Sequence, residues 1–197
     1  MIFTTTRARR AAGVIAALAA GALAISAPAA SASAAGGFIS GGGSVYDDFG
    51  DEGTISTTSA YRNSNVACLW QQILWAEGVK ESNGTAFDKS DADGRFGANS
   101  AYATKQLQKR WGLTADGVVG KGTFGKVDTK RQQIGGEWTG RLLHVGTDTS
   151  DPDEYYKLRY YGKSETLTFY RDDTGRYRFH TGQNSFAYVA YGHNSCD

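Results

Sequence analysis

Neither sign of charge is in excess in this 197-residue chain, which has 21 Lys and Arg residues against 20 Asp and Glu. This balance removes the electrostatic footprint of a nucleic-acid-binding protein, so we expect no nucleic-acid partner. Proline, histidine and cysteine are scarce, at 2, 3 and 2 residues, which leaves few candidates for metal ligation or thiol chemistry. Glycine (26 residues) and aromatic residues (12%) are plentiful. These contents exclude both a collagen and a wholly disordered chain.

Long apolar runs are missing except for one of about 15 residues at 11–25, short of the roughly 20 that span a bilayer. The run follows Arg7, Arg9 and Arg10 and precedes Ala32-Ser33-Ala34, a pattern typical of a secretory signal peptide. We predict a signal peptide over residues 1–34 and a secreted protein with no membrane contact after cleavage. The pair Arg9-Arg10 leaves the export route open between the general and twin-arginine pathways. The remainder has 18 basic and 20 acidic residues.

The two cysteines, Cys68 and Cys196, both lie after the predicted cleavage site. In an oxidising compartment an even pair is more often bridged than free, so we predict a disulfide between them. It would close a loop of more than 100 residues and stabilise the fold by about 4–5 kcal/mol in the chain-entropy model.

The rest of the chain divides into three regions and predicts an α+β fold. Residues 35–62 are rich in Gly, Ser and Thr and indicate a flexible spacer. Residues 63–130 indicate a small three-helix bundle. Its first helix is predicted to begin at an N-cap among residues 63–65 and to end at Gly78. One face of this helix is apolar and contains Val66, Leu69, Trp70, Ile73 and Leu74. A second helix is predicted over 100–110, with Asn99 as its N-cap, and a third over 121–127.

Residues 136–197 contain half of the chain's aromatic residues and indicate an antiparallel β-meander. Strands are predicted over 140–145, 155–160, 165–171, 176–181 and 186–191. About 60 residues is thin for an independent sheet, so we expect it to pack on the helices. Alternating tyrosines leave two interpretations of the sheet open: a second carbohydrate or protein contact surface, or a cover that completes the core.

Two similar loops occur in the helical region. The first is Asp93-Gly94-Arg95-Phe96-Gly97 and the second is Asp116-Gly117-Val118-Val119-Gly120. In each, the acid can accept hydrogen bonds from downstream amides, and the first glycine supplies the positive φ that a tight turn needs. The second glycine comes just before a predicted helix.

This arrangement resembles the peptidoglycan-binding-like domain, a three-helix module of cell-wall hydrolases and other wall-associated proteins. The resemblance covers about 65 residues. It includes Trp70-Gln71, Leu74, Gly78, both loops, Leu107-Gln108, Gly112-Leu113 and Thr123-Phe124. Three departures are that Phe124 replaces the usual Trp, that the third helix is rich in glycine, and that the 79–92 connection is longer than usual.

The resemblance implies noncovalent binding to peptidoglycan, whose sugar rings stack on aromatic side chains and whose stem peptides need hydrogen-bond partners. The candidate ligand-binding residues on or beside the loops are Arg95, Phe96, Asn99, Ser100, Gln108 and Trp111. Phe96 and Trp111 have an alternative interpretation as core residues. The turn-building residues are Asp93, Gly94, Gly97, Asp116, Gly117 and Gly120.

Catalytic alternatives have less support in the sequence. An EF-hand centred on Gly94 fails, because its first and twelfth positions would be Lys89 and Ser100 rather than carboxylates. A small zinc peptidase would draw its ligands from His144, Asp151, His180 and His193, but their flanking residues do not match that class. A bridged Cys196 cannot be a nucleophile.

We therefore expect a noncatalytic, monomeric protein without cofactor or metal, extracellular or associated with the cell wall, whose partner is peptidoglycan. Two alternatives stay open. One is a small zinc-dependent cell-wall hydrolase with its site in the β region. The other is a secreted interaction or inhibitor protein in which the helical module is only a scaffold.

Overall fold

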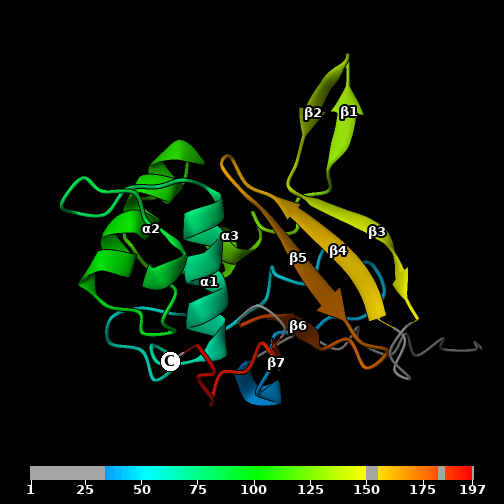
Figure 1. Cartoon of the computed structure of the whole chain (residues 1–197), viewed down its shortest axis with the longest axis horizontal. Helices are drawn as coiled ribbons and strands as arrows, with labels where there is room; N and C mark the ends of the chain where they lie inside the picture. Colours follow the sequence, from blue (N-terminus) through cyan, green and yellow to red (C-terminus); the bar gives the residue numbers. More distant parts are fainter. Residues whose placement is uncertain (1–33, 150–154, 182–184, 197) are drawn as a thin grey trace, which may run out of the picture.

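The computed structural model describes residues 34–149, 155–181 and 185–196 (Figure 1). The predicted signal peptide, apart from Ala34, lies outside these residues. None of the helices in the described ranges has the length and apolar character that crossing a bilayer requires.

The helical part contains α1 (Asn65–Ala76), α2 (Ala98–Arg110) and the short α3 (Lys121–Phe124), with 3-10 turns η1 (Ala34–Gly36) and η2 (Lys89–Asp91). Ser64 caps α1 by accepting a hydrogen bond from the Ala67 N–H at 3.1 Å. Helix α2 begins earlier than predicted, with Gly97 rather than Asn99 at the N-cap. Helix α3 has only four residues, so the expected three-helix bundle fits loosely. Its glycines, Gly122 and Gly125, explain the early end.

The sheet is an antiparallel five-stranded meander in the order β3-β4-β5-β6-β7, as the aromatic runs predicted. Its strands are β3 (Leu142–Asp148), β4 (Tyr155–Tyr161), β5 (Thr166–Arg171), β6 (Tyr177–His180) and β7 (Phe186–Tyr188). A two-stranded hairpin that the sequence did not predict, β1 (Gln132–Ile134) and β2 (Glu137–Thr139), projects from the body (Figure 1).

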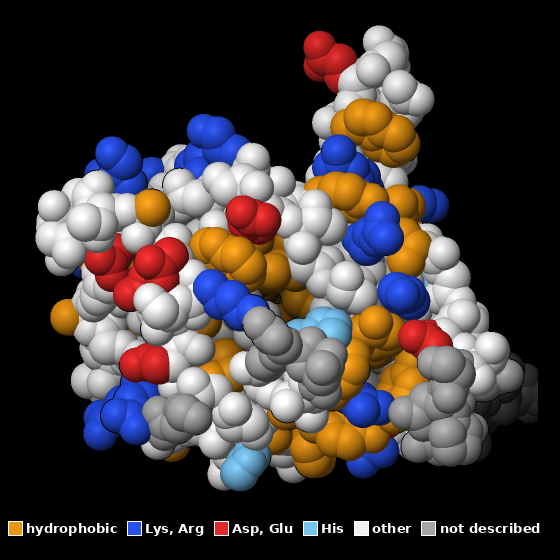
Figure 2. Space-filling view, viewed as in Figure 1, with side chains coloured by type: hydrophobic (Ala, Val, Ile, Leu, Met, Phe, Trp, Pro, Cys, Tyr) orange, Lys and Arg blue, Asp and Glu red, His pale blue; other side chains and the backbone are white. Residues whose placement is uncertain are grey.

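The two faces of the sheet have different roles. The strand register places Leu158, Phe169 and Phe179 on one face, and all three are buried. The opposite face carries Lys157 and Tyr170 among other polar and aromatic residues. Figure 2 shows apolar and basic side chains interleaved over the sheet. One face thus completes the core, and the other is aromatic and partly exposed.

Helix α1 is buried almost throughout, because α2 packs on one side of it and the sheet on another. Polar contacts join the helical part to the sheet. The Glu77 carboxylate accepts hydrogen bonds from Arg110, from Arg141 at 3.3 Å and from the Tyr160 hydroxyl at 2.6 Å. The predicted disulfide between Cys68 and Cys196 is confirmed in the structure and joins α1 to the C-terminal tail.

The segment 35–62 differs from the flexible spacer that we expected. Its Ile39, Phe49 and Ile55 are fully buried in the same hydrophobic cluster as α1 and the sheet. Backbone bridges pair Ser40 with Arg176 and Ile55 with Val119. Burial of these apolar side chains holds the segment in place although its composition is that of a linker.

Candidate binding site

Each Asp-Gly loop is held by one buried glutamine. In the first loop, Gln71 Nε2 donates to Asp93 Oδ1 at 3.0 Å, to Ser100 Oγ at 3.0 Å and to the Arg95 carbonyl at 3.2 Å. Gln71 Oε1 accepts from the Gly94 N–H at 2.7 Å. The Asp93 carboxylate also accepts from the Arg95 N–H at 2.8 Å, and Gly94 has the positive φ expected of the turn, +75°.

The second loop repeats this network with Gln108. Its Nε2 donates to Asp116 Oδ1 and to the Val118 carbonyl at 2.9 Å each, and to Thr123 Oγ1 at 3.1 Å. Its Oε1 accepts from the Gly117 N–H at 2.9 Å. Hydrogen bonds from the Val118 N–H and from Gln108 lower the pKa of Asp116. The two loops are therefore structural duplicates: in each, the acid accepts a hydrogen bond from the N–H two residues later and the first glycine has a positive φ.

This network changes the interpretation of three candidate ligand-binding residues. Phe96, Ser100 and Gln108 are at most 3% exposed. Ser100 and Gln108 take part in the loop networks, and Phe96 belongs to the core. Their burial leaves little of their surface for a polymer outside the fold, although Gln108 also belongs to the lining of a small hollow beside the second loop.

The other three candidates lie nearer the surface. Trp111 is half-buried, packs edge-on against Trp70 and has the Arg141 guanidinium 4.4 Å from its ring centroid. It joins the helices to the sheet. Asn99 accepts from the Ser82 N–H at 3.4 Å and donates to Glu81. Arg95 is exposed. Arg95 and Asn99 thus remain reachable from outside.

The C-terminal tail covers the first loop. Asn194 Nδ2 donates to the Asp93 carbonyl at 2.9 Å, and a Cβ on Gly94 would lie 2.1 Å from Asn194 Oδ1. The Asn65 N–H donates to the His193 carbonyl at 2.5 Å, and the disulfide anchors Cys196 beside it. The tail therefore leaves little room for a polymer against this loop.

A hollow of about 580 Å³, here called the α2 groove, lies between α2 and the connection that precedes it. Its lining is Val79, Lys80, Glu81, Ser82, Gly84, Tyr102, Gln106, Lys109 and Arg110. Tyr102 is 37% exposed, and hydrogen bonds from Thr85 and Asn99 lower the pKa of Glu81. The groove combines an aromatic ring, three cations and a carboxylate, which suits a ligand with both apolar faces and charged groups.

The α2 groove was not predicted from the sequence. Of the sequence candidates, Asn99 lies beside it, because its side chain hydrogen-bonds to the lining residues Glu81 and Ser82. Tyr102 lies on the exposed side of α2, away from the buried Ala103 and Leu107. The unusually long 79–92 connection was the signal that could have indicated it, because its first part forms the opposite wall.

A smaller hollow of about 280 Å³ adjoins the second loop. Its lining includes the polar side chains of Thr54, Thr114, Lys121 and Thr123 but contains no aromatic ring. It offers hydrogen bonds without a stacking surface, so the α2 groove is the better candidate.

The zinc alternative gains no support from the described residues. His144 Nε2 lies 2.9 Å from the Gly146 carbonyl, and His180 packs against Tyr170 and Phe186. Burial, with nearby lysines, lowers the pKa of His180. Asp151 lies outside the described residues, and within them no group of three His, Cys, Asp or Glu side chains could hold a metal ion.

Comparison with known proteins identifies the helical part. A family model described as "Putative peptidoglycan binding domain" matches residues 70–127, which contain α2, α3, both loops and the whole lining of the α2 groove. The β-rich region that follows is not recognised by a family model. No curated protein and no solved structure matches the chain significantly. The chain therefore contains a peptidoglycan-binding-like domain, as the loop motifs predicted.

Proposed function

We propose that this chain is a secreted, noncatalytic protein that binds cell-wall peptidoglycan through the α2 groove. The observation that carries the proposal is the position of this groove. Every residue that lines it belongs to the segment that matches the peptidoglycan-binding family, and Tyr102 is exposed there. The disulfide between Cys68 and Cys196 supports export to an oxidising compartment.

The chemistry of the groove suits both components of peptidoglycan. The Tyr102 ring offers a surface on which the C–H face of a sugar can stack. Lys80 and Lys109 are exposed and can pair with the carboxylates of stem peptides. Arg110 is held by the Glu77 carboxylate, and its Nη1 donates to the Glu77 carbonyl at 2.8 Å, so it is fixed at the end of the groove.

A sedimentation assay with purified sacculi tests the proposal. The oxidised protein, produced by secretion from the full-length sequence, should sediment with sacculi. Tyr102→Ala should weaken retention by about tenfold, because aromatic side chains carry a large share of binding energy at such contacts. Phe186→Ala is the matched control, since Phe186 is 41% exposed, similar to Tyr102, but lies on β7.

Two results would contradict the proposal. One is wild-type protein that stays wholly in the supernatant. The other is an equal loss of binding in Tyr102→Ala and Phe186→Ala. Muropeptide release, measured with and without a chelator, separates binding from hydrolysis: release that the chelator abolishes would favour the zinc hydrolase.

One observation favours the alternative of an interaction protein. Ile134 and Trp138 are more than half exposed on the projecting β1–β2 hairpin. Exposed apolar residues of this size are common where proteins bind one another. This function would be supported if the wild-type protein does not sediment with sacculi and if Trp138→Ala weakens its binding to a protein partner.

A further inference from the structure

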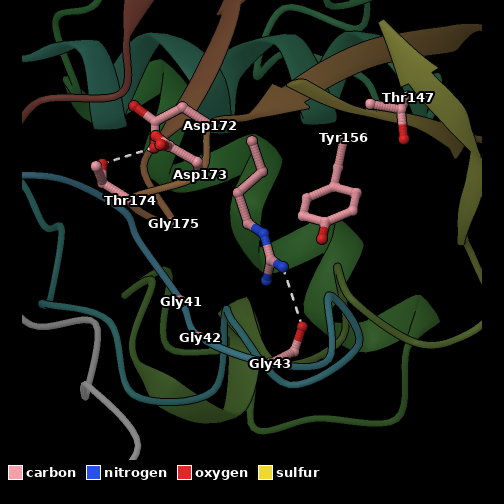
Figure 3. Close-up of a pocket in the computed structure, with 10 residues that line it drawn as sticks. Gly41, Gly42, Gly43, Thr147, Tyr156, Asp172, Asp173, Thr174 and Gly175 are labelled. Atoms are coloured by element: carbon pink, nitrogen blue, oxygen red, sulfur yellow. Dashed lines mark hydrogen bonds between the residues drawn. The ribbon is translucent and has the colours of Figure 1, made fainter. Parts of the chain in front are cut away.

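A third hollow, here called the glycine-loop pocket, lies outside the segment that matches the family. Its volume is about 440 Å³, within the range of small-molecule sites. Figure 3 shows the four segments that meet there: the backbone of residues 41–43, β3 with Thr147, β4 with Tyr156, and the turn after β5 with Asp172, Asp173, Thr174 and Gly175.

The glycines explain why the pocket exists. A Cβ on Gly41 would lie 1.7 Å from Asp48 Oδ1, and a Cβ on Gly175 would lie 1.9 Å from the Gly41 carbonyl oxygen. Only glycine lets these segments approach so closely. A Cβ on Gly42 or Gly43 would instead have no atom within 4 Å. One wall of the pocket is therefore bare backbone beside open space.

Arg171, like Asp172, is a buried charged residue of the pocket lining. Its Nη1 donates to Asp48 Oδ2 at 2.7 Å, and its Nη2 donates to the Gly43 carbonyl at 3.0 Å. Its Nε is buried and has no acceptor among the described residues. The guanidinium lies 5.0 Å from the centroid of the Tyr156 ring, on the adjacent strand. The ion pair between Arg171 and Asp48 holds the guanidinium in place and adds no net positive charge to the pocket.

The charges of the pocket exclude an anionic ligand as its best occupant. Asp48 already neutralises Arg171, and Asp172 is paired with Arg176 at 2.9 Å. Asp173 is exposed and adds a negative charge at the rim. A phosphate or carboxylate would meet this charge without a free cation to compensate.

The remaining groups fit a neutral ligand rich in hydroxyls. Asp173 accepts hydrogen bonds, and the hydroxyls of Thr147 and Tyr156 both donate and accept them. The Thr174 hydroxyl donates to Asp172 Oδ1 at 2.7 Å and can accept a hydrogen bond from a ligand. The Tyr156 ring adds an apolar surface. A pyranose ring presents hydroxyls around its edge and C–H groups on its faces, so it matches both kinds of group.

We propose that the glycine-loop pocket binds a neutral pyranose ring of a polysaccharide, with Tyr156 against the ring and Asp173 on its hydroxyls. Naming the glycan strand of peptidoglycan as the source rests on the proposed function. The protein would then contact the wall at two places, the α2 groove and this pocket, and the second contact would raise the overall avidity.

Backbone amide NMR shifts on titration with N-acetylchitotetraose, a neutral sugar without stem peptide, test this inference. The expected shifts fall on the amides of Gly42, Gly43, Thr147 and Gly175. Tyr156→Ala should weaken binding at least about fivefold through loss of the ring contact. Gly42→Leu should also weaken it by filling the pocket, since its Cβ meets no neighbour. Phe186→Ala removes an exposed ring that lies outside the linings of both the glycine-loop pocket and the α2 groove, so it is the control and should leave these shifts unchanged.

Maltotetraose distinguishes the two sources of the ring. Selective binding of chitotetraose supports the glycan strand, whereas equal binding of both sugars supports a pyranose site for another polysaccharide. The inference is overturned by three results: no shifts with either sugar at about 10 mM, shifts confined to the α2 groove, or unchanged affinity in Tyr156→Ala. If the NMR spectrum of Tyr156→Ala loses its dispersion, this variant is unfolded, and the sugar affinities of Gly42→Leu and Asp173→Asn test the inference instead.

The sugar titration and the sacculus assay can fail separately. Protein that binds chitotetraose at the glycine-loop pocket but ignores sacculi would contradict the proposed function and leave the pocket inference standing. Protein that sediments with sacculi through Tyr102 but shows no amide shifts with either sugar would contradict the pocket inference and leave the proposed function standing.

Discussion

At the scale of single residues, Gln71 and Gln108 each make four hydrogen bonds within the helical module. Each amide bonds an aspartate, a hydroxyl, a backbone carbonyl and a glycine N–H. Glutamine suits this position because it carries donors and an acceptor on one planar group. Neither residue touches solvent appreciably, so their contribution is to the shape of the loops.

Replacing Gln108 by Leu keeps the side-chain size but leaves the buried Gly117 N–H and Thr123 hydroxyl without their partner. We expect the free energy of unfolding to fall by about 2–4 kcal/mol, measured by urea denaturation with tryptophan fluorescence. The pKa of Asp116 should also rise toward its ordinary value, because Gln108 helps to lower it.

Gln132→Leu is the matched control, because Gln132 is exposed on β1, and its effect should stay within about 0.5 kcal/mol. Equal unfolding midpoints for the two variants would show that the network adds nothing to stability.

At the scale of elements, the segment 34–62 is fixed to the rest of the fold by buried acids as well as by apolar residues. The Glu52 carboxyl is buried and accepts a hydrogen bond from the Tyr191 hydroxyl, which itself accepts from the Gly53 N–H at 2.8 Å. Burial, with a smaller contribution from the nearby Asp51 and Asp48, raises the pKa of Glu52 from 4.5 to about 8, although the hydrogen bond from Tyr191 opposes the shift. Burial likewise raises the pKa of Asp128 to about 6.

These raised pKa values make the docking of this segment depend on pH. Between pH 4.5 and 8, the folded state holds a proton on Glu52 that the unfolded state has released. Stability should therefore fall as pH rises through this window, by at most about 1.4 kcal/mol per pH unit for this group. Asp128 adds the same trend up to about pH 6.

Glu52→Gln retains an acceptor for Tyr191 and removes the titration. We expect the variant to gain stability relative to the wild type as pH rises from 5 to 8, measured by urea denaturation at each pH. Glu137→Gln, on the exposed strand β2, should run parallel to the wild type. Parallel curves for Glu52→Gln as well would mean that Glu52 is not the group responsible.

The same elements show what the sequence can and cannot predict. Helix α1 was predictable because its apolar residues recur every three or four positions, and the meander because its aromatic runs end at clear turns. The segment 34–62 was not. Its buried residues Ile39, Val45, Phe49 and Ile55 are spaced four to six positions apart, which matches neither a helix nor a strand. The β1–β2 hairpin has no apolar alternation to reveal it.

The candidate site was predictable as a module but not as a surface. The loop motifs indicate the right region but do not tell which of their side chains point inward. They therefore predict Ser100 and Gln108 as ligand contacts, and Phe96 as either a contact or a core residue, although all three are buried. The α2 groove depends on the 79–84 stretch folding beside α2, which is a tertiary contact without a local pattern.

At the scale of the whole molecule, the helices, the sheet and the N-terminal segment share one hydrophobic core. The disulfide closes this body between residues 128 positions apart. The disulfide also holds the tail near the first loop, where Asn194 donates to the Asp93 carbonyl, and near the start of α1, where the His193 carbonyl accepts from Asn65.

Replacing both Cys68 and Cys196 by Ser should lower the free energy of unfolding by about 3–5 kcal/mol, because the open chain gains loop entropy when it unfolds. Amide exchange should also quicken at Asn65, whose N–H donates to the His193 carbonyl in the tail. Both changes are measured against the oxidised wild type. Reductant should reproduce them in the wild type and do nothing to the double variant; an unchanged urea midpoint would contradict the prediction.

The place where the family match begins has a practical consequence. It starts at Trp70, five residues into α1, so its boundaries omit the Ser64 cap and the disulfide half at Cys68. A targeting tag made of residues 70–127 alone would contain a truncated α1, and the face of α1 that packs against the sheet would be exposed to solvent. The transplantable unit is the whole body that begins before Ile39 and ends at Cys196, with any cargo attached outside it.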